Sequence, residues 1–156
     1  MSDNTRSPTR NKSTAAERPF EILMVEDNTG DVRLTSEAFR KLGLANNMNS
    51  VGDGVEAMAF LRHQGKYASV PRPDLILVDL NLPKKDGREV LLEIKNDEGL
   101  RDIPVIVLTG SKADQDIITS YKFRANCFVS KTGNMGQLIE VIRFVRDSWL
   151  KPQDRT

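Results

Sequence analysis

The sequence contains little of the chemistry that builds disulfide frameworks or soft-metal sites. Cys127 is the single cysteine and His63 the single histidine among 156 residues. An internal disulfide and a cysteine-rich or histidine-rich metal centre are therefore excluded, and this usage fits a reducing cytosol. Because neither residue has a second ligand or nucleophile beside it, we expect Cys127 to be a small packing residue and His63 to lie on the surface.

Long hydrophobic runs and an excess of one charge are also missing. The longest apolar runs are about four residues, such as 75–78 and 105–108, whereas a membrane-spanning helix needs ~20. The formal net charge is +1, which argues against a general attraction to nucleic acid or to an anionic membrane. We therefore expect a cytoplasmic protein without direct nucleic-acid or membrane partners.

Residues 1–18 have almost no apolar side chains. They are rich in Ser, Thr, Asn and Arg, so burial cannot offset the entropy of ordering them, and we expect a disordered N-terminal tail. The tail has no apolar segment of the secretory kind. Its charge of +2 leaves −1 for the remainder. We expect one folded domain over residues 19–150 and a short C-terminal tail over residues 151–156.

From residue 20 onward, short runs rich in Val, Ile and Leu alternate with stretches of helical period. This alternation predicts repeated strand–helix units and an α/β fold with a parallel sheet. The predicted strands are Glu21 to Glu26, Met48 to Val51, Leu75 to Asp79, Pro104 to Thr109 and Asn126 to Ser130. A helix is expected after each of them.

The composition of the strands predicts their order. The first, third and fourth are apolar on both faces and so belong in the middle of the sheet, whereas the second and fifth are mixed and belong at its edges. Right-handed crossovers then favour the doubly wound, flavodoxin-like order 2-1-3-4-5.

Several helix starts are marked by pairs of capping residues. The pairs are Asp53 with Glu56, Asp86 with Glu89, and Asn134 with Gln137. The last helix has the clearest apolar stripe, with residues at spacings of three and four: Met135, Leu138, Ile139, Ile142, Val145 and Trp149.

Polar residues stand where the predicted strands end. Glu26 and Asp27 follow the first strand, Asp79 ends the third, Thr109 ends the fourth and Lys131 follows the fifth. Because parallel strands bring their carboxyl ends to one edge of the sheet, these side chains are expected to converge there. Three carboxylates without His or Cys select a hard divalent ion such as Mg²⁺.

The predicted pocket suits phosphoryl transfer. Three carboxylates, one lysine and one Mg²⁺ sum to zero charge, so a phosphoryl group could enter without prohibitive repulsion. A carboxylate can act as the nucleophile and form an aspartyl phosphate. Asp79 is the candidate because it ends the most apolar central strand, with Glu26 and Asp27 alongside as metal ligands.

Together with the motif Leu-Val-Asp-Leu-Asn-Leu-Pro-Lys-Lys-Asp-Gly around Asp79 and with Thr109-Gly110, these positions resemble the receiver domain of two-component response regulators. The resemblance covers roughly residues 20–150. The stretch from Pro71 to Leu91 and the Trp149-Leu150 ending are most similar to the single-domain regulators that pair with cyanobacterial and bacterial phytochromes.

The resemblance implies a role for each matched position. Asp79 resembles the phospho-acceptor, and Mg²⁺ or Mn²⁺ would be held at Glu26, Asp27, Asp79 and the backbone carbonyl of Asn81. Lys131 resembles the phosphate-pairing lysine. Thr109 resembles the switch hydroxyl, and Phe128 the aromatic residue whose rotamer reports its movement.

The resemblance also implies partners. The phosphoryl donor would be a sensor histidine kinase of phytochrome type, and the output would pass through phosphorylation-dependent contacts with an unknown downstream protein. The chain would be a phospho-acceptor switch rather than an enzyme, with only intrinsic self-phosphorylation and autodephosphorylation. A homodimer through the face of the fourth helix, fifth strand and final helix is a further hypothesis, motivated by Val141, Phe144 and Trp149 beyond the inward stripe.

The sequence departs from the family pattern after the lysine. Thr132 stands where the family usually has proline, so we expect a trans bond there, because a cis non-prolyl bond costs about 2.5–4 kcal/mol. Asn81 and Ser111 stand where the family tunes hydrolysis of the phosphate.

Three alternatives remain at this stage. A degenerate receiver would act as a constitutive binding module, although neither the acidic residues nor the lysine are missing. A phosphoaspartate hydrolase of the haloacid dehalogenase class would need an Asp-x-Asp motif, whereas Asp79 is followed by Leu80 and Asn81. The stretch Gly52 to Ala57 fits a dinucleotide-binding pattern, but its strand is a polar edge strand and its glycines read as turn residues.

Overall fold

The computed structural model describes residues 19–80, 82, 84–109, 127–130 and 135–148. The predicted tails at 1–18 and 151–156 lie outside this range, as does the predicted fourth helix between residues 110 and 126. In the described part of the chain, no helix is long and apolar enough to cross a membrane.

The core of the fold is a five-stranded parallel sheet in the order β2-β1-β3-β4-β5, which confirms the predicted order. Its strands are β1 (Phe20–Val25), β2 (Asn46–Val51), β3 (Leu75–Asp79), β4 (Val105–Thr109) and β5 (Cys127–Ser130). The bounds of β3 are those predicted. β2 begins two residues earlier than predicted, because Asn46 pairs with Phe20 at the start of β1.

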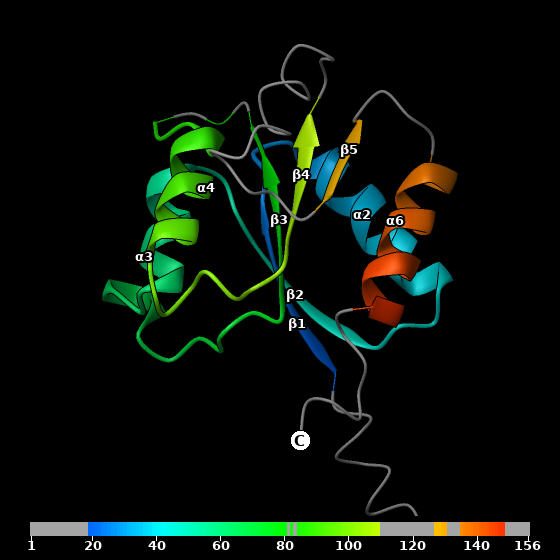
Figure 1. Cartoon of the computed structure of the whole chain (residues 1–156), viewed down its shortest axis with the longest axis horizontal. Coiled ribbons are helices and arrows are strands. Elements are labelled where there is room, and N and C mark those ends of the chain that lie inside the picture. Colours follow the sequence, from blue (N-terminus) through cyan, green and yellow to red (C-terminus); the bar gives the residue numbers. More distant parts are fainter. Residues whose placement is uncertain (1–18, 81, 83, 110–126, 131–134, 149–156) are drawn as a thin grey trace, which may run out of the picture.

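Helices cover both faces of the sheet (Figure 1). One face carries α3 (Gly54–Leu61) and α4 (Gly87–Asn96), and the other carries α2 (Thr29–Lys41) and α6 (Met135–Ser148). A short 3-10 helix, η2 (Gly65–Tyr67), follows α3. This is the two-sided cover that the apolar central strands predict.

The side chains of the central strands alternate between two hydrophobic clusters. Leu23, Val25, Ile76 and Val78 belong to the cluster that includes residues of α3 and α4. The residues between them on the same strands, such as Met24 and Leu77, belong to the cluster that includes residues of α2 and α6. This period of two holds the register of each strand, since a slip of one residue would exchange the two faces.

The helix starts close to the sheet edge are fixed by caps. At α4 the predicted capping box is present: the Asp86 side chain accepts from the backbone of the first turn, and Glu89 Oε1 accepts from Asp86 N–H at 3.2 Å. At α3 only half of the predicted box forms. Asp53 Oδ1 accepts from Glu56 N–H at 2.8 Å, but the Glu56 carboxylate accepts from the Tyr67 hydroxyl instead. Asn134 lies outside the described residues.

Part of the apolar stripe predicted for the final helix, α6, is confirmed. Ile142 and Val145 are buried, and Leu138 and Ile139 pack half-buried against the same cluster. Val141 was predicted to lie outside the stripe, but it also packs against this cluster, because α6 contacts α2 as well as the sheet. Phe144 remains 54% exposed. His63 is exposed, as predicted.

Candidate functional site

The end of β1 and the end of β3 bring three carboxylates together. Val25 and Val78 are paired in neighbouring strands, so the residues that follow them, Glu26 and Asp79, lie side by side at the carboxyl edge of the sheet. Glu26 is also held from the other side, because its N–H donates to the carbonyl of Val51 at 2.9 Å. The predicted convergence at this edge is therefore found for the carboxylates.

The three side chains differ in their exposure. Glu26 and Asp79 are 3% and 2% exposed, whereas Asp27 is exposed. Glu26 Oε2 accepts from Asn28 N–H at 3.2 Å, which orients that carboxylate at the turn into α2. The site thus consists of two buried carboxylates, Glu26 and Asp79, and a third, Asp27, that faces solvent.

The donor set fits a hard divalent cation. Glu26, Asp27 and Asp79 each offer a carboxylate oxygen, and these atoms all lie within 4.8 Å of one another. Three negative charges at that spacing repel one another, and two of them are removed from solvent. An Mg²⁺ or Mn²⁺ ion bound by carboxylate oxygens would relieve this repulsion, and among the described residues neither Cys nor His belongs to the group.

The chain after Asp79 folds back onto the end of β3. Leu80 N–H donates to the Leu108 carbonyl at 3.2 Å, and Gly87 N–H donates to the Leu80 carbonyl at 3.0 Å. A Cβ on Gly87 would lie 2.6 Å from the Leu80 Cα and closer still to the Asp79 carbonyl oxygen. Glycine is therefore required where α4 begins beside Asp79.

A second glycine contact closes the loop between β3 and α4 against α3. A Cβ on Gly54 would lie 2.6 Å from the Lys85 Cβ and closer still to the Lys85 carbonyl oxygen. The sequence predicts a turn role for Gly54, but close backbone packing against Lys85 is what requires glycine there. At the start of α3 the Glu56 N–H already donates to Asp53 Oδ1 and is not offered to a phosphate, so the Gly52 to Ala57 alternative is not supported.

The remaining predicted residues are described only in part. Thr109 ends β4 and pairs with Ser130, and Phe128 pairs with Val107, so both backbones occupy the predicted strands. Their side chains lie outside the described part, as do Asn81, Lys131 and Thr132. Their roles, and the trans geometry expected after Lys131, stay predictions.

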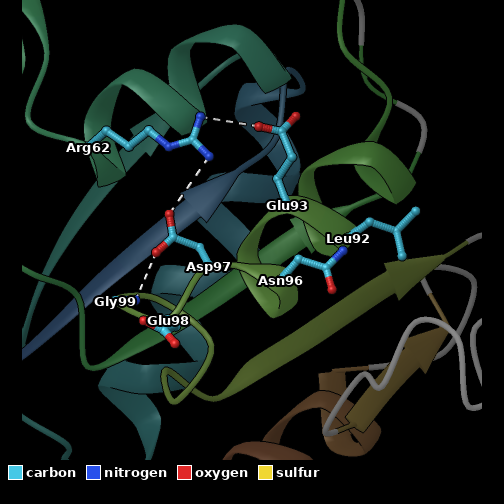
Figure 2. A pocket seen from close by; sticks show the side chains of 7 residues that line it. All are labelled: Arg62, Leu92, Glu93, Asn96, Asp97, Glu98 and Gly99. Atoms are coloured by element: carbon cyan, nitrogen blue, oxygen red, sulfur yellow. Dashed lines mark hydrogen bonds and ion pairs between the residues drawn. The ribbon is translucent and has the colours of Figure 1, made fainter.

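A separate hollow of about 670 Å³ lies at the other end of α4. It is lined by Arg62, Leu92, Glu93, Asn96, Asp97, Glu98 and Gly99. Figure 2 shows the Arg62 guanidinium between Glu93 and Asp97, and the two ion pairs measure 3.2 Å and 3.8 Å. Because α4 starts beside Asp79 and ends at Asn96, this hollow is remote from the three carboxylates. Its Glu93 and Asp97 carboxylates are paired with Arg62, and none of its lining residues belongs to the cluster of Glu26, Asp27 and Asp79.

Sequence reasoning missed the contacts that hold the loop after Asp79. Lys84 pairs with Asp53 of the turn before α3, with Nζ and Oδ2 3.6 Å apart, and Lys85 pairs with Glu93 of α4. Asp53 precedes Lys84 by a whole helix and strand, and Glu93 lies eight residues after Lys85, so neither pair follows the spacing of three or four within one helix. The only hint of these ion pairs in the sequence is the Lys84-Lys85 dipeptide in the motif after Asp79.

The chain is similar to known proteins over most of its length. Residues 22–143 match the family model described as response regulator receiver domain. The response regulator Rcp1 of Synechocystis sp. is 46% identical over 133 residues, which cover 85% of this chain and 90% of Rcp1. The probable methanogenesis regulatory protein FilR2 of Methanothrix harundinacea is 41% identical, with 86% of each chain covered.

Two solved structures are similar over the same range. The phosphorylated cyanobacterial phytochrome response regulator RcpA has a TM-score of 0.73 at 48% identity, covering 85% of this chain and 94% of its own. The Mn²⁺-bound form of response regulator Rcp1 also has a TM-score of 0.73, at 46% identity, covering 85% of this chain and 96% of its own.

Proposed function

The chain belongs to the response regulator receiver family, and on that premise we propose that Asp79 is its phospho-acceptor, served by Mg²⁺ or Mn²⁺ at Glu26, Asp27 and Asp79. The observation that carries this proposal is the meeting of three carboxylates within 4.8 Å at the end of the central strand β3. Burial holds Asp79 in place, and the exposed Asp27 leaves one side of the cluster open to solvent.

The proposed reaction is a transfer of one phosphoryl group. An Asp79 carboxylate oxygen forms a bond to phosphorus while the bond from phosphorus to the imidazole nitrogen of a phosphohistidine breaks, and the released imidazole keeps the bonding electron pair. A bound divalent ion supplies charge neutralisation for the phosphoryl oxygens. Glu26 and Asp27 hold that ion and leave the attacking oxygen to Asp79.

The other matched positions complete the proposal. The backbone carbonyl of Asn81 adds a metal ligand, and Lys131 pairs with the phosphoryl group. Thr109 moves toward the phosphoryl oxygen, and Phe128 transmits the change to the surface. The chain then acts as a switch that signals through protein contacts, within a folded domain over residues 19–150, and not as an enzyme for external substrates.

The proposed donor is a sensor histidine kinase of phytochrome type. Support comes from the likeness to Rcp1 and to RcpA, the latter described as a phytochrome response regulator. A homodimer through α6 and its neighbours is proposed as well, because Phe144 leaves a large apolar side chain 54% exposed on that helix.

The acceptor is tested by labelling the protein with acetyl phosphate and Mg²⁺ and resolving the products on a Phos-tag gel. Wild type is expected to show a shifted band, and Asp79→Asn none. Asp102→Asn is the matched control, since Asp102 is an exposed loop carboxylate. Labelling of Asp79→Asn as strong as that of wild type would refute the assignment. Undetectable Mg²⁺ binding by titration would favour the degenerate receiver instead.

A further inference from the structure

Lys84 occupies an unusual backbone conformation close to the acceptor. Its φ is 65°, in the left-handed region that glycine and asparagine adopt more readily than lysine. It lies five residues after Asp79, in the loop that leads to α4. A lysine in this conformation needs support from its surroundings, and its side chain shows where that support lies.

The ammonium group of Lys84 is directed to a fixed carboxylate. Its Nζ lies 3.6 Å from Asp53 Oδ2, and the Asp53 side chain is only 12% exposed. The other oxygen, Asp53 Oδ1, caps α3 by accepting from Glu56 N–H. The capping bond therefore holds Asp53 in one orientation and makes it a rigid partner for a lysine that is itself 69% exposed.

This ion pair joins the two segments that flank the carboxylate cluster. Asp53 lies two residues after Val51, and the Val51 carbonyl accepts from Glu26 N–H at the end of β1. Lys84 belongs to the loop whose ends meet at Leu80 and Gly87, directly after Asp79. The pair thus connects the segment that holds Glu26 with the segment that follows Asp79.

The neighbouring residue restrains the loop a second time. The Lys85 backbone sits against Gly54 at the start of α3, and its ammonium pairs with Glu93 of α4. Of these two successive lysine side chains, that of Lys84 pairs with the turn after β2 and that of Lys85 pairs with α4.

We propose that Lys84 and Asp53 are positioning residues for the metal and phosphoryl site at Asp79, because their ion pair fixes the loop after Asp79 against the turn after β2. This inference rests on the proposed function. Neither side chain is assigned a contact with the metal or with the phosphoryl group.

Electrostatics alone predicts a different outcome, which makes the proposal testable. The positive charge of Lys84 opposes cation binding at the nearby carboxylates. If charge were its only influence, losing it would therefore increase the affinity for Mg²⁺. The charge of Asp53 favours the cation, so its loss would weaken Mg²⁺. Positioning predicts instead that either loss weakens Mg²⁺, and that losing both costs little more than losing one.

The experiment is a calorimetric titration of the full chain with MgCl₂, together with the rate of labelling by acetyl phosphate. The variants are Lys84→Met, Asp53→Asn, their combination and Lys84→Arg. Asparagine retains the cap of α3, and methionine keeps a side chain of similar length without the charge. Lys66→Met is the control, since Lys66 of η2 is 74% exposed and pairs with Glu56 of α3 at 3.5 Å.

We expect the Mg²⁺ dissociation constant to rise roughly two- to fivefold in each single variant and by no more than that in the combination, on the scale of an exposed ion pair. Lys84→Arg and Lys66→Met are expected to match wild type. Urea unfolding of every variant separates a loss of metal binding from a loss of folding.

Two results would overturn the inference: equal or tighter Mg²⁺ binding by Lys84→Met, or additive changes in the combination. If Asp53→Asn does not fold, the Lys84→Met titration decides alone. A failure of the proposed function would give a different result, because the wild type itself would then bind no Mg²⁺ and would not be labelled by acetyl phosphate.

Discussion

Gly87 lies against the backbone of Asp79 so closely that no side chain fits between them. A Cβ on Gly87 would be 2.6 Å from the Leu80 Cα and closer still to the Asp79 carbonyl oxygen. The first residue of α4 is therefore in direct contact with the end of β3, where Asp79 lies. The position of this helix and the position of the Asp79 backbone cannot change independently.

Gly87→Ala is expected to lower the free energy of unfolding by about 1–3 kcal/mol, because the added methyl group must displace backbone atoms. It is also expected to weaken Mg²⁺ binding, since Asp79 shifts with the helix. Gly52→Ala is the control, as a Cβ there meets no atom within 4 Å. Urea denaturation and Mg²⁺ titration of both variants provide the measurement, and equal values for the two would contradict the prediction.

Asp79→Asn is expected to stabilise the metal-free protein by roughly 1 kcal/mol, because it removes one of three mutually repelling charges. In Mg²⁺ the wild type is expected to be the more stable of the two proteins. At a hundredfold excess over its dissociation constant, an ion bound only to the folded state adds ~2.7 kcal/mol to the free energy of unfolding of the wild type. Urea curves in EDTA and in MgCl₂ test both statements. A variant that gains as much stability from Mg²⁺ as wild type would remove Asp79 from the site.

Tyr67 is expected to make stability depend on pH at alkaline values. Burial and the Glu56 carboxylate, which accepts from its hydroxyl, raise the pKa of Tyr67 to about 12. Because the folded value exceeds the ordinary value of about 10, this contribution is complete below pH 10 and is lost as the pH rises toward 12.

Tyr67→Phe removes the hydroxyl and is expected to cost about 0.5–1.5 kcal/mol at neutral pH. The variant should lose less stability than wild type between pH 10 and 12. Thermal unfolding across this range, with the ultraviolet absorbance of tyrosinate as a second readout, measures the effect. Identical pH profiles for the two proteins would show that the Glu56 contact does not form.

Phe144→Ser is expected to reduce self-association if α6 forms a dimer interface, since Phe144 is 54% exposed on that helix. Leu34→Ser is the matched control, because Leu34 is 56% exposed on α2. Sedimentation velocity over a concentration series, with and without phosphorylation, gives the result. A wild-type protein that stays monomeric throughout would exclude the dimer.

The central strands and the acidic cluster were predictable because their signals are local. Leu75 to Asp79 is apolar on both faces and ends in a carboxylate, and the structure has β3 at those bounds. The rule that parallel strands end at one edge was enough to bring Glu26 and Asp27 to Asp79.

Features set by tertiary contact were not predictable in the same way. Asn46 and Asn47 join β2 through their register with β1, although neither favours a strand. Val141 is covered because α6 packs on α2. The hydroxyl of Tyr67 takes the Glu56 carboxylate away from the expected capping box, and the Lys84 pair depends on a left-handed backbone that no periodicity reveals.

The capping box of α4 has a consequence for how anions are received. A helix start normally offers free N–H groups and a positive dipole end to an oxyanion. At α4 the N–H groups of Asp86, Gly87 and Arg88 donate to Glu89, Leu80 and Asp86, respectively. The start of α4, which lies against Asp79, is therefore already satisfied by the protein's own oxygens. A free oxyanion such as sulfate therefore gains no cradle of N–H groups at the start of α4.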